Sequence, residues 1–258
     1  MQIKVLASGS KGNAIFFELG GTRLLIDAGI SARRIEKSLG LFGVKASELD
    51  AILVTHEHTD HVNGIDVLAR RHCLPVFARP GVWDCLNFKD NLAPECRREI
   101  YDSFDIGPVK IEAFQISHDA ADPVGFCLSH QGSKHVVATD LGKATKKVID
   151  ALAWADTVVL EANHDVDMLA NGSYPFFLKK RIRSSVGHLS NLDAARILGS
   201  ISRRPSMQVF LAHLSQENNH PDLAEKTVRE FLLNQGCDVG HEVILHPTYQ
   251  NQISGYSE

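Results

Sequence analysis

The stretch Thr55-His56-Glu57-His58-Thr59-Asp60-His61 constrains this chain more than any other part of it. It follows Ala51-Ile52-Leu53-Val54, an apolar run that predicts a short buried strand. Three imidazoles and the Asp60 carboxylate therefore crowd one turn at a strand end, and divalent metals accept both ligand types. The alternative is a polar loop with chance histidines, since the chain has 13 of them. The density of the cluster favours a metal-dependent hydrolase.

The bulk composition is that of a soluble globular protein. The chain has 258 residues, of which 44% are hydrophobic and 22% charged, enough for one large domain or two small ones. Its formal net charge is -4, so no global basic field attracts nucleic acid and an anionic substrate must be held locally. Strand-like and helix-like segments interleave from end to end, without repeats or linkers. We therefore predict one α/β domain over residues 1–258.

The cysteines and the N-terminus indicate a cytoplasmic protein. The five cysteines are scattered and form no C-x-x-C pair, so neither a disulfide framework nor a zinc knuckle is expected. A reducing cytosol fits this usage. The segment after Met1 reaches Gly9 too quickly for a signal peptide, and no apolar run approaches membrane-spanning length. We expect no membrane partner.

Hydrophobic periodicity predicts alternating strands and helices, whereas residues 89–108 show no usable period. The predicted strands cover residues 3–7, 14–18, 22–26, 51–54, 75–78, 109–116, 124–129, 134–139, 156–160, 207–212 and 242–245. The predicted helices cover residues 30–39, 62–71, 82–88, 145–153, 175–183, 192–198 and 221–234.

Further ligand-type residues follow other predicted strands. His118, Asp140 and His213 each come directly after a strand-like run, as the loop beginning at His56 does. Taken singly, His118 or His213 would be an ordinary loop histidine. Because strand ends meet at one edge of a sheet, their repetition predicts that these side chains come together there.

Two other stretches have a functional and an ordinary interpretation. The glycine-rich turn from Ser8 to Asn13 can present N–H groups to a phosphate or bring Asn13 into a site, or it can be a plain hairpin turn. Asp27, at the end of a strand, can support a metal ligand or can simply be a turn residue.

The run H-x-H-x-D-H, formed by His56, His58, Asp60 and His61, resembles the hallmark of the metallo-β-lactamase-fold hydrolases. Asp27 resembles the early aspartate of that superfamily. The resemblance continues, in chain order, through His118, Asp140 and His213. It covers nearly the whole chain and implies a four-layer αββα sandwich, with two β-sheets face to face and helices outside.

Other stretches resemble the YycJ/WalJ group within that superfamily. They are Leu6 to Asn13, Leu160 to Asp165, Tyr174-Pro175, Leu178 to Arg183, Gly187 to Asn191, Leu211 to Ser215 and Asn218 to Pro221. This resemblance implies a DNA exonuclease running 5′ to 3′ on duplex DNA, related to ribonuclease Z, with a place in DNA repair by analogy only. The long exosite arm of ribonuclease Z has no obvious counterpart here, which counts against tRNA processing.

The resemblance also implies a ligand set for two divalent ions, zinc or manganese with iron as a further option. The first metal would be held by His56, His58 and His118, the second by Asp60, His61 and His213, and both by a bridging Asp140. Two such ions share a hydroxide and clamp a phosphodiester for in-line attack. Asp60 would in addition orient or deprotonate the attacking water.

Several residues outside the seven ligands complete the predicted site. His188 would protonate the leaving oxygen or hold a phosphate oxygen, although it could also be a helix-cap histidine without a role. Glu161 would orient His188, although it could equally pair with a surface lysine. The predicted DNA-binding residues are Ser10, Asn13, Lys179, Arg181 and Arg183. A solvated basic helix face is the alternative for the last three, and phosphate contacts would make binding salt-dependent.

Two other functions compete with the nuclease. One is a small-molecule hydrolase on the same fold, such as a thioesterase, lactonase or cyclic phosphodiesterase. The stretch Gly187-His188-Leu189-Ser190 and the basic residues 179–183 are better suited to phosphate. The other is a regulatory or binding protein without catalysis, and the complete ligand set argues against it.

Overall fold

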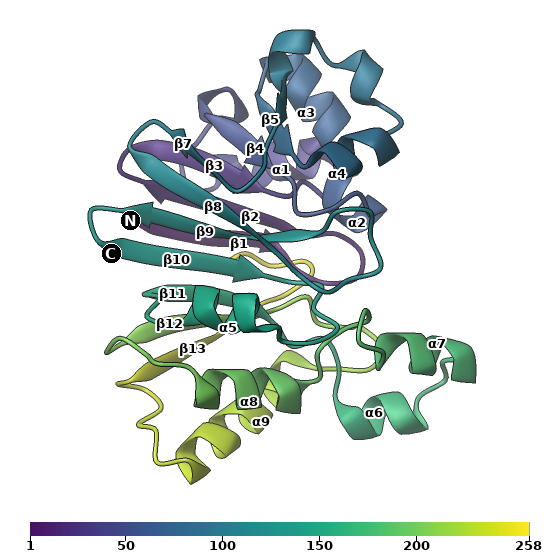
Figure 1. The fold of residues 1–258 in the computed structure, drawn as a ribbon, viewed down its shortest axis with the longest axis vertical. Helices are drawn as coiled ribbons and strands as arrows, with labels where there is room; N and C mark the ends of the chain where they lie inside the picture. The colour runs from purple at the N-terminus through teal and green to yellow at the C-terminus, as the bar shows by residue number, and fades with distance from the viewer. Residues whose placement is uncertain (258) are drawn as a thin grey trace. The chain divides into compact units, whose positions relative to one another are not determined.

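The computed structural model describes residues 1–257. The chain divides into two compact units. Unit 1 comprises residues 1–113, 120–124 and 250–258, and unit 2 comprises residues 114–119 and 125–249. Figure 1 shows the path of the chain through both. The expectation of a single domain over residues 1–258 stays a prediction.

Unit 1 is built on a mixed seven-stranded sheet in the order β14-β1-β2-β3-β4-β5-β6. Its strands are β1 (Gln2–Ala7), β2 (Ala14–Leu19), β3 (Thr22–Ile26), β4 (Ala51–Leu53), β5 (Val76–Ala78), β6 (Arg97–Glu99) and β14 (Ser254–Ser257). Neighbouring strands from β3 to β6 are parallel, whereas β14, β1, β2 and β3 pair with their neighbours antiparallel. Gly20 and Gly21 join β2 to β3, both with positive φ, as a tight hairpin turn requires.

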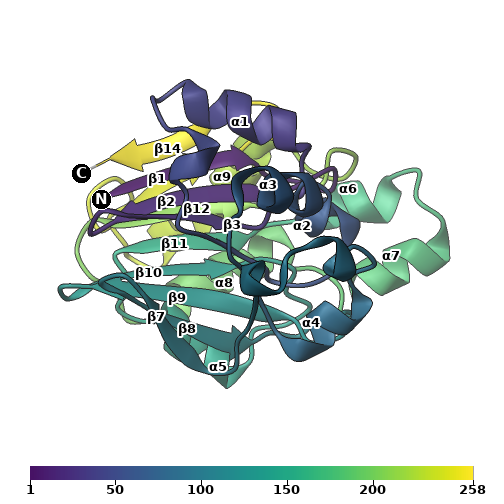
Figure 2. The ribbon, with the colours of Figure 1, turned by 90° about the horizontal axis from the view of Figure 1, so that it is seen from above.

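The helices of unit 1 bury one apolar face each. They are α1 (Ala32–Gly40), α2 (Thr59–Val62), α3 (Ile65–His72) and α4 (Pro80–Cys85). Ile35 and Leu39 of α1 and Leu68 of α3 belong to one buried cluster with Phe16 and Ile52 of the sheet. Figure 2 shows α1 and α3 together on the same side of this sheet. The core therefore lies between sheet and helices, as amphipathic helices demand.

Unit 2 is built on a second mixed seven-stranded sheet in the order β13-β12-β11-β10-β9-β8-β7. Its strands are β7 (Ser103–Ile106), β8 (Val109–Gln115), β9 (Val124–His130), β10 (Ser133–Ala138), β11 (Thr157–Glu161), β12 (Met207–Ala212) and β13 (Val243–Pro247). The chain passes from unit 1 into unit 2 within β8. Strands β10 to β13 are parallel, and β11 and β12 are buried along their whole length, which is typical of strands covered on both faces.

Unit 2 contains five further helices. They are α5 (Lys146–Leu152), α6 (Val166–Asn171), α7 (Phe176–Ile182), α8 (Asn191–Ser200) and α9 (Pro221–Asn234). Val148, Leu198 and Val228, from α5, α8 and α9, share one buried cluster with Leu160 and Leu211 of the sheet. In Figure 1, α5, α8 and α9 lie against the strands, whereas α6 and α7 lie beyond their ends.

The structure differs from the sequence prediction in several elements. The helix predicted over residues 62–71 is α3, which begins only at Ile65, and the short helix α2 before it was not predicted. Gly64 separates the two helices: its N–H donates to the Ala28 carbonyl, and a Cβ there would lie 2.3 Å from the Ile30 carbonyl oxygen. The helix predicted over residues 82–88 is α4, which begins earlier, at a proline well suited to a first turn. Strands β6, β7 and β14 and helix α6 were not predicted.

Two mixed sheets with helices are the components that the predicted αββα sandwich requires. None of the helices in residues 1–257 is long and apolar enough to cross a membrane.

Candidate metal centre

The loop after β4 is fixed to the turn after β1 by backbone hydrogen bonds. The N–H of Asn13 donates to the Asp60 carbonyl at 2.8 Å, and the N–H of Gly29 donates to the Asn13 carbonyl at 2.7 Å. A Cβ on Gly29 would lie 1.6 Å from the Asp60 carbonyl oxygen, so only glycine allows this approach. The glycine-rich turn thus positions the loop that carries the histidines.

The side chain of Asp27 also holds that loop in place. It is buried, has a φ of 58°, and accepts hydrogen bonds from the Thr55 N–H at 2.9 Å, the Thr55 hydroxyl at 2.8 Å and His61 Nδ1 at 2.7 Å. A carboxylate on Nδ1 fixes the tautomer of His61, so that Nε2 carries the lone pair for a metal. Asp27 therefore supports a candidate ligand and is more than a turn residue.

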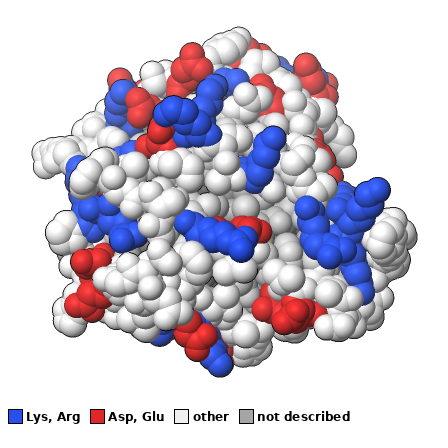
Figure 3. All heavy atoms as spheres, turned by 60° about the horizontal axis from the view of Figure 1, so that its bottom comes forward, with Lys and Arg blue, Asp and Glu red and all other residues white. Residues whose placement is uncertain are grey.

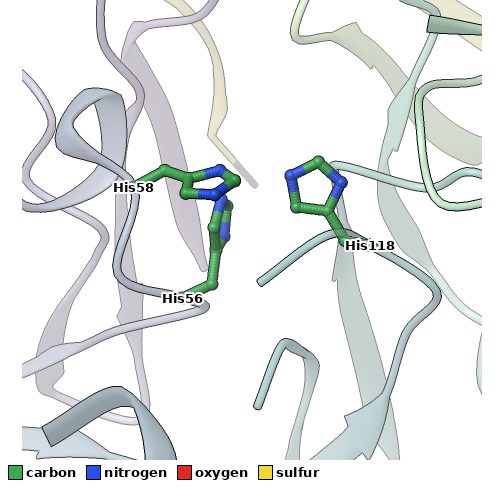
Figure 4. Close-up of side chains that lie close together, drawn as sticks. All are labelled: His56, His58 and His118. Carbon is green, nitrogen blue, oxygen red and sulfur yellow. The ribbon is translucent and has the colours of Figure 1, made fainter. Parts of the chain in front are cut away.

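His56, His58, Asp60 and His61 form what we call the N-terminal cluster. The His56 and His58 ring centroids lie 4.6 Å apart, and those of His56 and His61 4.1 Å apart. Because the Thr55 hydroxyl already donates to Asp27, it accepts from His56 Nδ1 at 3.0 Å, which leaves the lone pair of His56 on Nε2. Figure 4 shows the rings of His56 and His58 on this loop, and also His118, from the loop after β8.

Asn13 reaches the same cluster with its side chain. Its Nδ2 lies 3.1 Å from His61 Nε2 and 3.4 Å from Asp60 Oδ2, while its Oδ1 accepts from the Gly9 N–H at 2.9 Å. Asn13 is buried, whereas Ser10, on the same turn, is exposed.

The register of the parallel strands gathers a second group of side chains in unit 2. Ala138, Leu160 and Leu211 are aligned across β10, β11 and β12, so the residues that follow leave the sheet at the same edge. Asp140 and His213 both have positive φ there, 59° and 55°, unusual values that re-aim a side chain. Together with His118, Glu161 and His188 these residues form what we call the C-terminal cluster.

Glu161 is the centre of the C-terminal cluster. One oxygen, Oε1, accepts from His188 Nδ1 and from His213 Nδ1, each at 2.8 Å. The other, Oε2, accepts from the N–H groups of Leu141 at 2.7 Å and Leu189 at 3.0 Å. Glu161 is fully buried, so the alternative of a surface ion pair is excluded. In their neutral forms both histidines therefore have their lone pairs on Nε2.

The remaining members of the cluster lie around Glu161. His118 Nδ1 donates to the Gly187 carbonyl at 3.3 Å, and its Nε2 lies 3.7 Å from Asp140 Oδ1. The same Asp140 oxygen lies 3.4 Å from His213 Nδ1 and 3.6 Å from His188 Nδ1. Asp140, Glu161, His188 and His213 are close enough together to hold a metal ion between them.

Electrostatics in this cluster favours an ionised glutamate. Burial opposes the charge on Glu161, but the positive charge of His188 and the hydrogen bonds from His188 and His213 outweigh burial and lower its pKa. Burial likewise opposes protonation of His188, yet attraction to Glu161 and their hydrogen bond raise its pKa. For His118 burial dominates, and its pKa is lowered. Neutral imidazole is the form that binds metals.

Each unit therefore contains buried histidines and carboxylates suited to a divalent ion. His56, His61, His118 and His213 each tie Nδ1 to an oxygen of the protein, the arrangement that supports metal-ligating histidines. Neutral imidazoles with carboxylates suit zinc, manganese and iron alike. Each cluster is consistent with a bound divalent ion, and neither reveals which metal is native.

The predicted DNA-binding cations differ in their surroundings. Lys179 Nζ donates to the Ala170 carbonyl at 2.8 Å, and Arg181 forms an ion pair with Asp119 at 2.7 Å, which raises the pKa of the guanidinium. Arg183 is exposed at the end of α7. His188 does not cap α8, because Ser190 is its N-cap.

Sequence reasoning missed two supporting residues. Thr55 links Asp27 to His56, and the Asn163 side chain donates to the His213 carbonyl at 2.8 Å, bracing its unusual φ. Asn163 stands within one of the stretches that resemble the YycJ/WalJ group, but its partner is 50 residues away. No local pattern points to that contact.

Comparison with known proteins places the chain in a family. Residues 22–213 match the model of the Beta-lactamase superfamily domain. The chain is 36% identical over 251 residues to Exodeoxyribonuclease YycJ of Bacillus anthracis, covering 96% of this chain and 95% of that protein. It is 35% identical over 259 residues to Exodeoxyribonuclease WalJ of Streptococcus pneumoniae, covering 98% and 96%.

Solved structures share the fold at low sequence identity. The metallo-beta-lactamase fold protein YhfI from Bacillus subtilis superimposes with a TM-score of 0.70 at 18% identity, covering 99% of both chains. The short form of human tRNase Z gives a TM-score of 0.65 at 18% identity, covering 98% of both chains. The α/β fold class predicted from the sequence is thereby confirmed as that of the metallo-β-lactamases.

Proposed function

This chain belongs to the metallo-β-lactamase superfamily and is a homologue of the YycJ and WalJ exodeoxyribonucleases, and from this premise we propose that it is a DNA exonuclease, digesting from 5′ to 3′ with two divalent ions. The observation that carries the proposal is the double use of Glu161, which holds the candidate ligand His213 and the non-ligand His188 with one oxygen. Such an arrangement would place an acid beside a bound metal ion, which suits phosphodiester cleavage.

The proposed ligands come from both clusters. His56, His58 and His118 would hold one ion, Asp60, His61 and His213 would hold the other, and Asp140 would serve both. When bound, the two ions supply a water-derived nucleophile at neutral pH and positive charge against the phosphodiester. Asp60 orients or deprotonates that water, in addition to its role as a ligand.

His188 acts on the leaving group in this proposal. Its Nδ1 is occupied by Glu161, so Nε2 is the nitrogen that faces substrate, and its side chain is 20% exposed while Glu161 is wholly buried. A proton held at Nε2 is donated to the departing oxygen, or to a phosphate oxygen as a hydrogen bond. Glu161 stays ionised and stabilises the charged imidazole.

The proposed substrate is DNA, held by local rather than global charge. Arg183 and Lys179 contribute positive charge from α7 and its C-cap, next to the Ile182 carbonyl that accepts the His188 N–H, and Arg181 contributes through its pair with Asp119. Asn13 reaches the scissile phosphate from the N-terminal cluster, with Ser10 on the exposed part of its turn. Action in the cytoplasm and in DNA repair follows from the proposed substrate and the family resemblance.

The test is an end-labelled digestion assay. Purified protein with Mn²⁺ or Zn²⁺ should release label from the 5′ end of linear duplex DNA before label from the 3′ end. Asp60→Ala and His188→Ala should each lower the rate by at least about 100-fold, since a general acid alone contributes that much. His241→Ala, at an exposed histidine remote in sequence from both clusters, serves as the matched control.

One outcome would contradict the proposed function, and another would contradict only the role of His188. If the protein with metal leaves DNA and RNA intact but hydrolyses a thioester or lactone, the function is that of a small-molecule hydrolase. If His188→Ala retains full nuclease activity, the role proposed for His188 is wrong even though the nuclease assignment stands.

A further inference from the structure

Helix α7 carries the two most exposed large apolar side chains among residues 1–257. Phe176 and Phe177, at its first two positions, are 77% and 73% exposed. Ile182 is the only residue of α7 that is buried. Exposed aromatic rings on so short a helix do not serve the core of unit 2, so they are available to a partner.

Positive charge accompanies these rings. The last turn of α7 contains Lys179, Lys180 and Arg181, and Arg183 follows as its C-cap. Lys179 and Arg181 have partners within unit 2, whereas Lys180 and Arg183 are exposed and form no ion pair with another residue of the described chain. Figure 3 shows Lys and Arg gathered over α7, at the right edge of that view, beside white surface. The exposed surface of α7 is therefore both aromatic and basic.

Helix α7 is fixed to the C-terminal cluster by its own backbone. The His188 N–H donates to the Ile182 carbonyl at 2.8 Å, and the Ser117 hydroxyl donates to the Ser185 carbonyl at 2.7 Å. A Cβ on Gly187 would lie 2.2 Å from the Ile182 carbonyl oxygen, so the segment from α7 to His188 packs closely on the helix end. Arg181 adds its ion pair to Asp119, the neighbour of His118. A ligand on α7 is consequently held at a defined place relative to His188.

We propose that Phe176 and Phe177 stack on unpaired bases of a single DNA strand while Lys180 and Arg183 contact its phosphates. The proposal rests on the DNA exonuclease function above, and it adds that the protein recognises a single-stranded end. Aromatic rings beside a basic stripe are the usual means of holding single strands without sequence preference, because every base has a π-face. Paired bases inside a duplex offer no such face, whereas frayed or overhanging ends do.

The first test measures binding without turnover. A short fluorescein-labelled single-stranded oligonucleotide is titrated with protein in buffer without added divalent ions, and anisotropy gives Kd. The double variant Phe176→Ala/Phe177→Ala should bind about 5- to 30-fold more weakly, as expected when base stacking is lost. The double variant Phe176→Trp/Phe177→Trp keeps an aromatic ring at both positions and should retain the affinity of the wild type. Leu41→Ala, at an apolar side chain 72% exposed on unit 1, should leave Kd unchanged.

The second test measures cleavage. On duplex DNA with a single-stranded overhang, the double Ala variant should show a raised KM with little change in kcat. Its selectivity for that DNA over bis(p-nitrophenyl) phosphate should fall by the factor seen in binding. Lys180→Ala/Arg183→Ala should weaken binding and also flatten its dependence on salt concentration.

The outcomes separate this inference from the function on which it rests. If the wild type digests DNA but the double Ala variant keeps its Kd and KM, the stacking surface is refuted and the exonuclease stands. If no nuclease activity is found but single strands still bind through Phe176 and Phe177, the exonuclease proposal fails alone. If both rings are needed for binding anionic phosphatidylglycerol vesicles and not for binding DNA, α7 is a membrane-surface element and the inference is wrong.

Discussion

Each unit of this protein anchors candidate metal-binding histidines with one buried carboxylate, but the two carboxylates differ in reach. Asp27 makes two of its three side-chain hydrogen bonds to Thr55, next to His56, and the third to His61. Glu161 instead joins His188 and His213, 27 and 52 residues further along the chain, and two backbone N–H groups. All residues of the N-terminal cluster come from one short segment of the chain, whereas those of the C-terminal cluster come from segments that the sheet of unit 2 brings together.

The difference has a consequence for stability. Loss of Asp27 leaves a loop still held by backbone hydrogen bonds from Asn13 and Gly29. Loss of Glu161 removes four hydrogen bonds at once, which connect the ends of β10, β11 and β12 with the loop before α8. The C-terminal cluster should therefore be the more sensitive of the two to removal of its anchor.

The largest effect is expected for Glu161→Ala. It leaves two histidine N–H groups and two backbone N–H groups without acceptors in a buried space, and should lower the free energy of unfolding by about 3–5 kcal/mol. Urea denaturation without divalent ions measures it. Asp27→Ala should cost clearly less, and Glu230→Ala, at an exposed position on α9, should cost almost nothing. An Asp27→Ala variant less stable than Glu161→Ala would refute the contrast between the anchors.

Gly29→Ala should destabilise unit 1 by about 1–3 kcal/mol, the usual cost of forcing an extra methyl group into a packed site. The new Cβ would lie 1.6 Å from the Asp60 carbonyl oxygen, so the loop or the turn must shift. Gly40→Ala, at a helical glycine whose added methyl group would meet no heavy atom within 4 Å, is the matched control and should be neutral or slightly stabilising. Equal stability of the two variants would show that the turn does not fix the loop.

Unit 2 also contains a buried histidine outside its cluster, and this makes it sensitive to acid. Burial lowers the pKa of His135 from 6.5 to about 4. The unfolded chain therefore binds more protons than the folded one between these values, and stability falls as pH drops below about 6.5. At pH 5 the loss from this residue is about 2 kcal/mol, at about 1.36 kcal/mol per pKa unit.

The variant His135→Leu isolates that contribution. Its free energy of unfolding should fall less than that of the wild type between pH 7 and pH 5, in urea titrations at both pH values. His241→Leu, at a largely exposed histidine, should follow the wild type. If His135→Leu loses as much stability as the wild type between pH 7 and pH 5, the acid sensitivity is due to other groups.

The same contrast explains which features could be predicted from sequence. The loop from His56 to His61 and its strand were predictable because ligands and apolar run are neighbours in the chain. The placement of Asp140 and His213 followed from strand ends, but the contact of Glu161 with His213 did not, since only the parallel register brings β11 and β12 together. The expectation that Glu161 orients His188 rests on the general ability of a carboxylate to fix a histidine tautomer, and no local pattern brings the two side chains together.

Two of the strands that escaped prediction lack an apolar period of their own. Strand β6 reads Arg-Arg-Glu and lies at a sheet edge, and β14 reads Ser-Gly-Tyr-Ser. Strand β14 forms because its backbone pairs with the edge of β1. Gln2 lies opposite Ser257, although the two residues are near opposite ends of the sequence. Such strands are determined by the neighbouring strand with which they form hydrogen bonds. A short window of sequence does not contain that neighbour and cannot predict the pairing.

The smallest effect is expected for Thr55→Val, which tests how far the N-terminal cluster depends on its own loop. Valine keeps the shape of threonine but removes the hydroxyl that donates to Asp27 and accepts from His56 Nδ1. The free energy of unfolding should fall by about 1 kcal/mol, and affinity for Zn²⁺, measured by competition with a chromophoric chelator, should fall at least about 10-fold. Thr59→Val, at an exposed position of the same loop, is the control. If Thr55→Val loses stability but keeps its zinc affinity, the hydroxyl supports the loop alone and Asp27 orients the histidines without it.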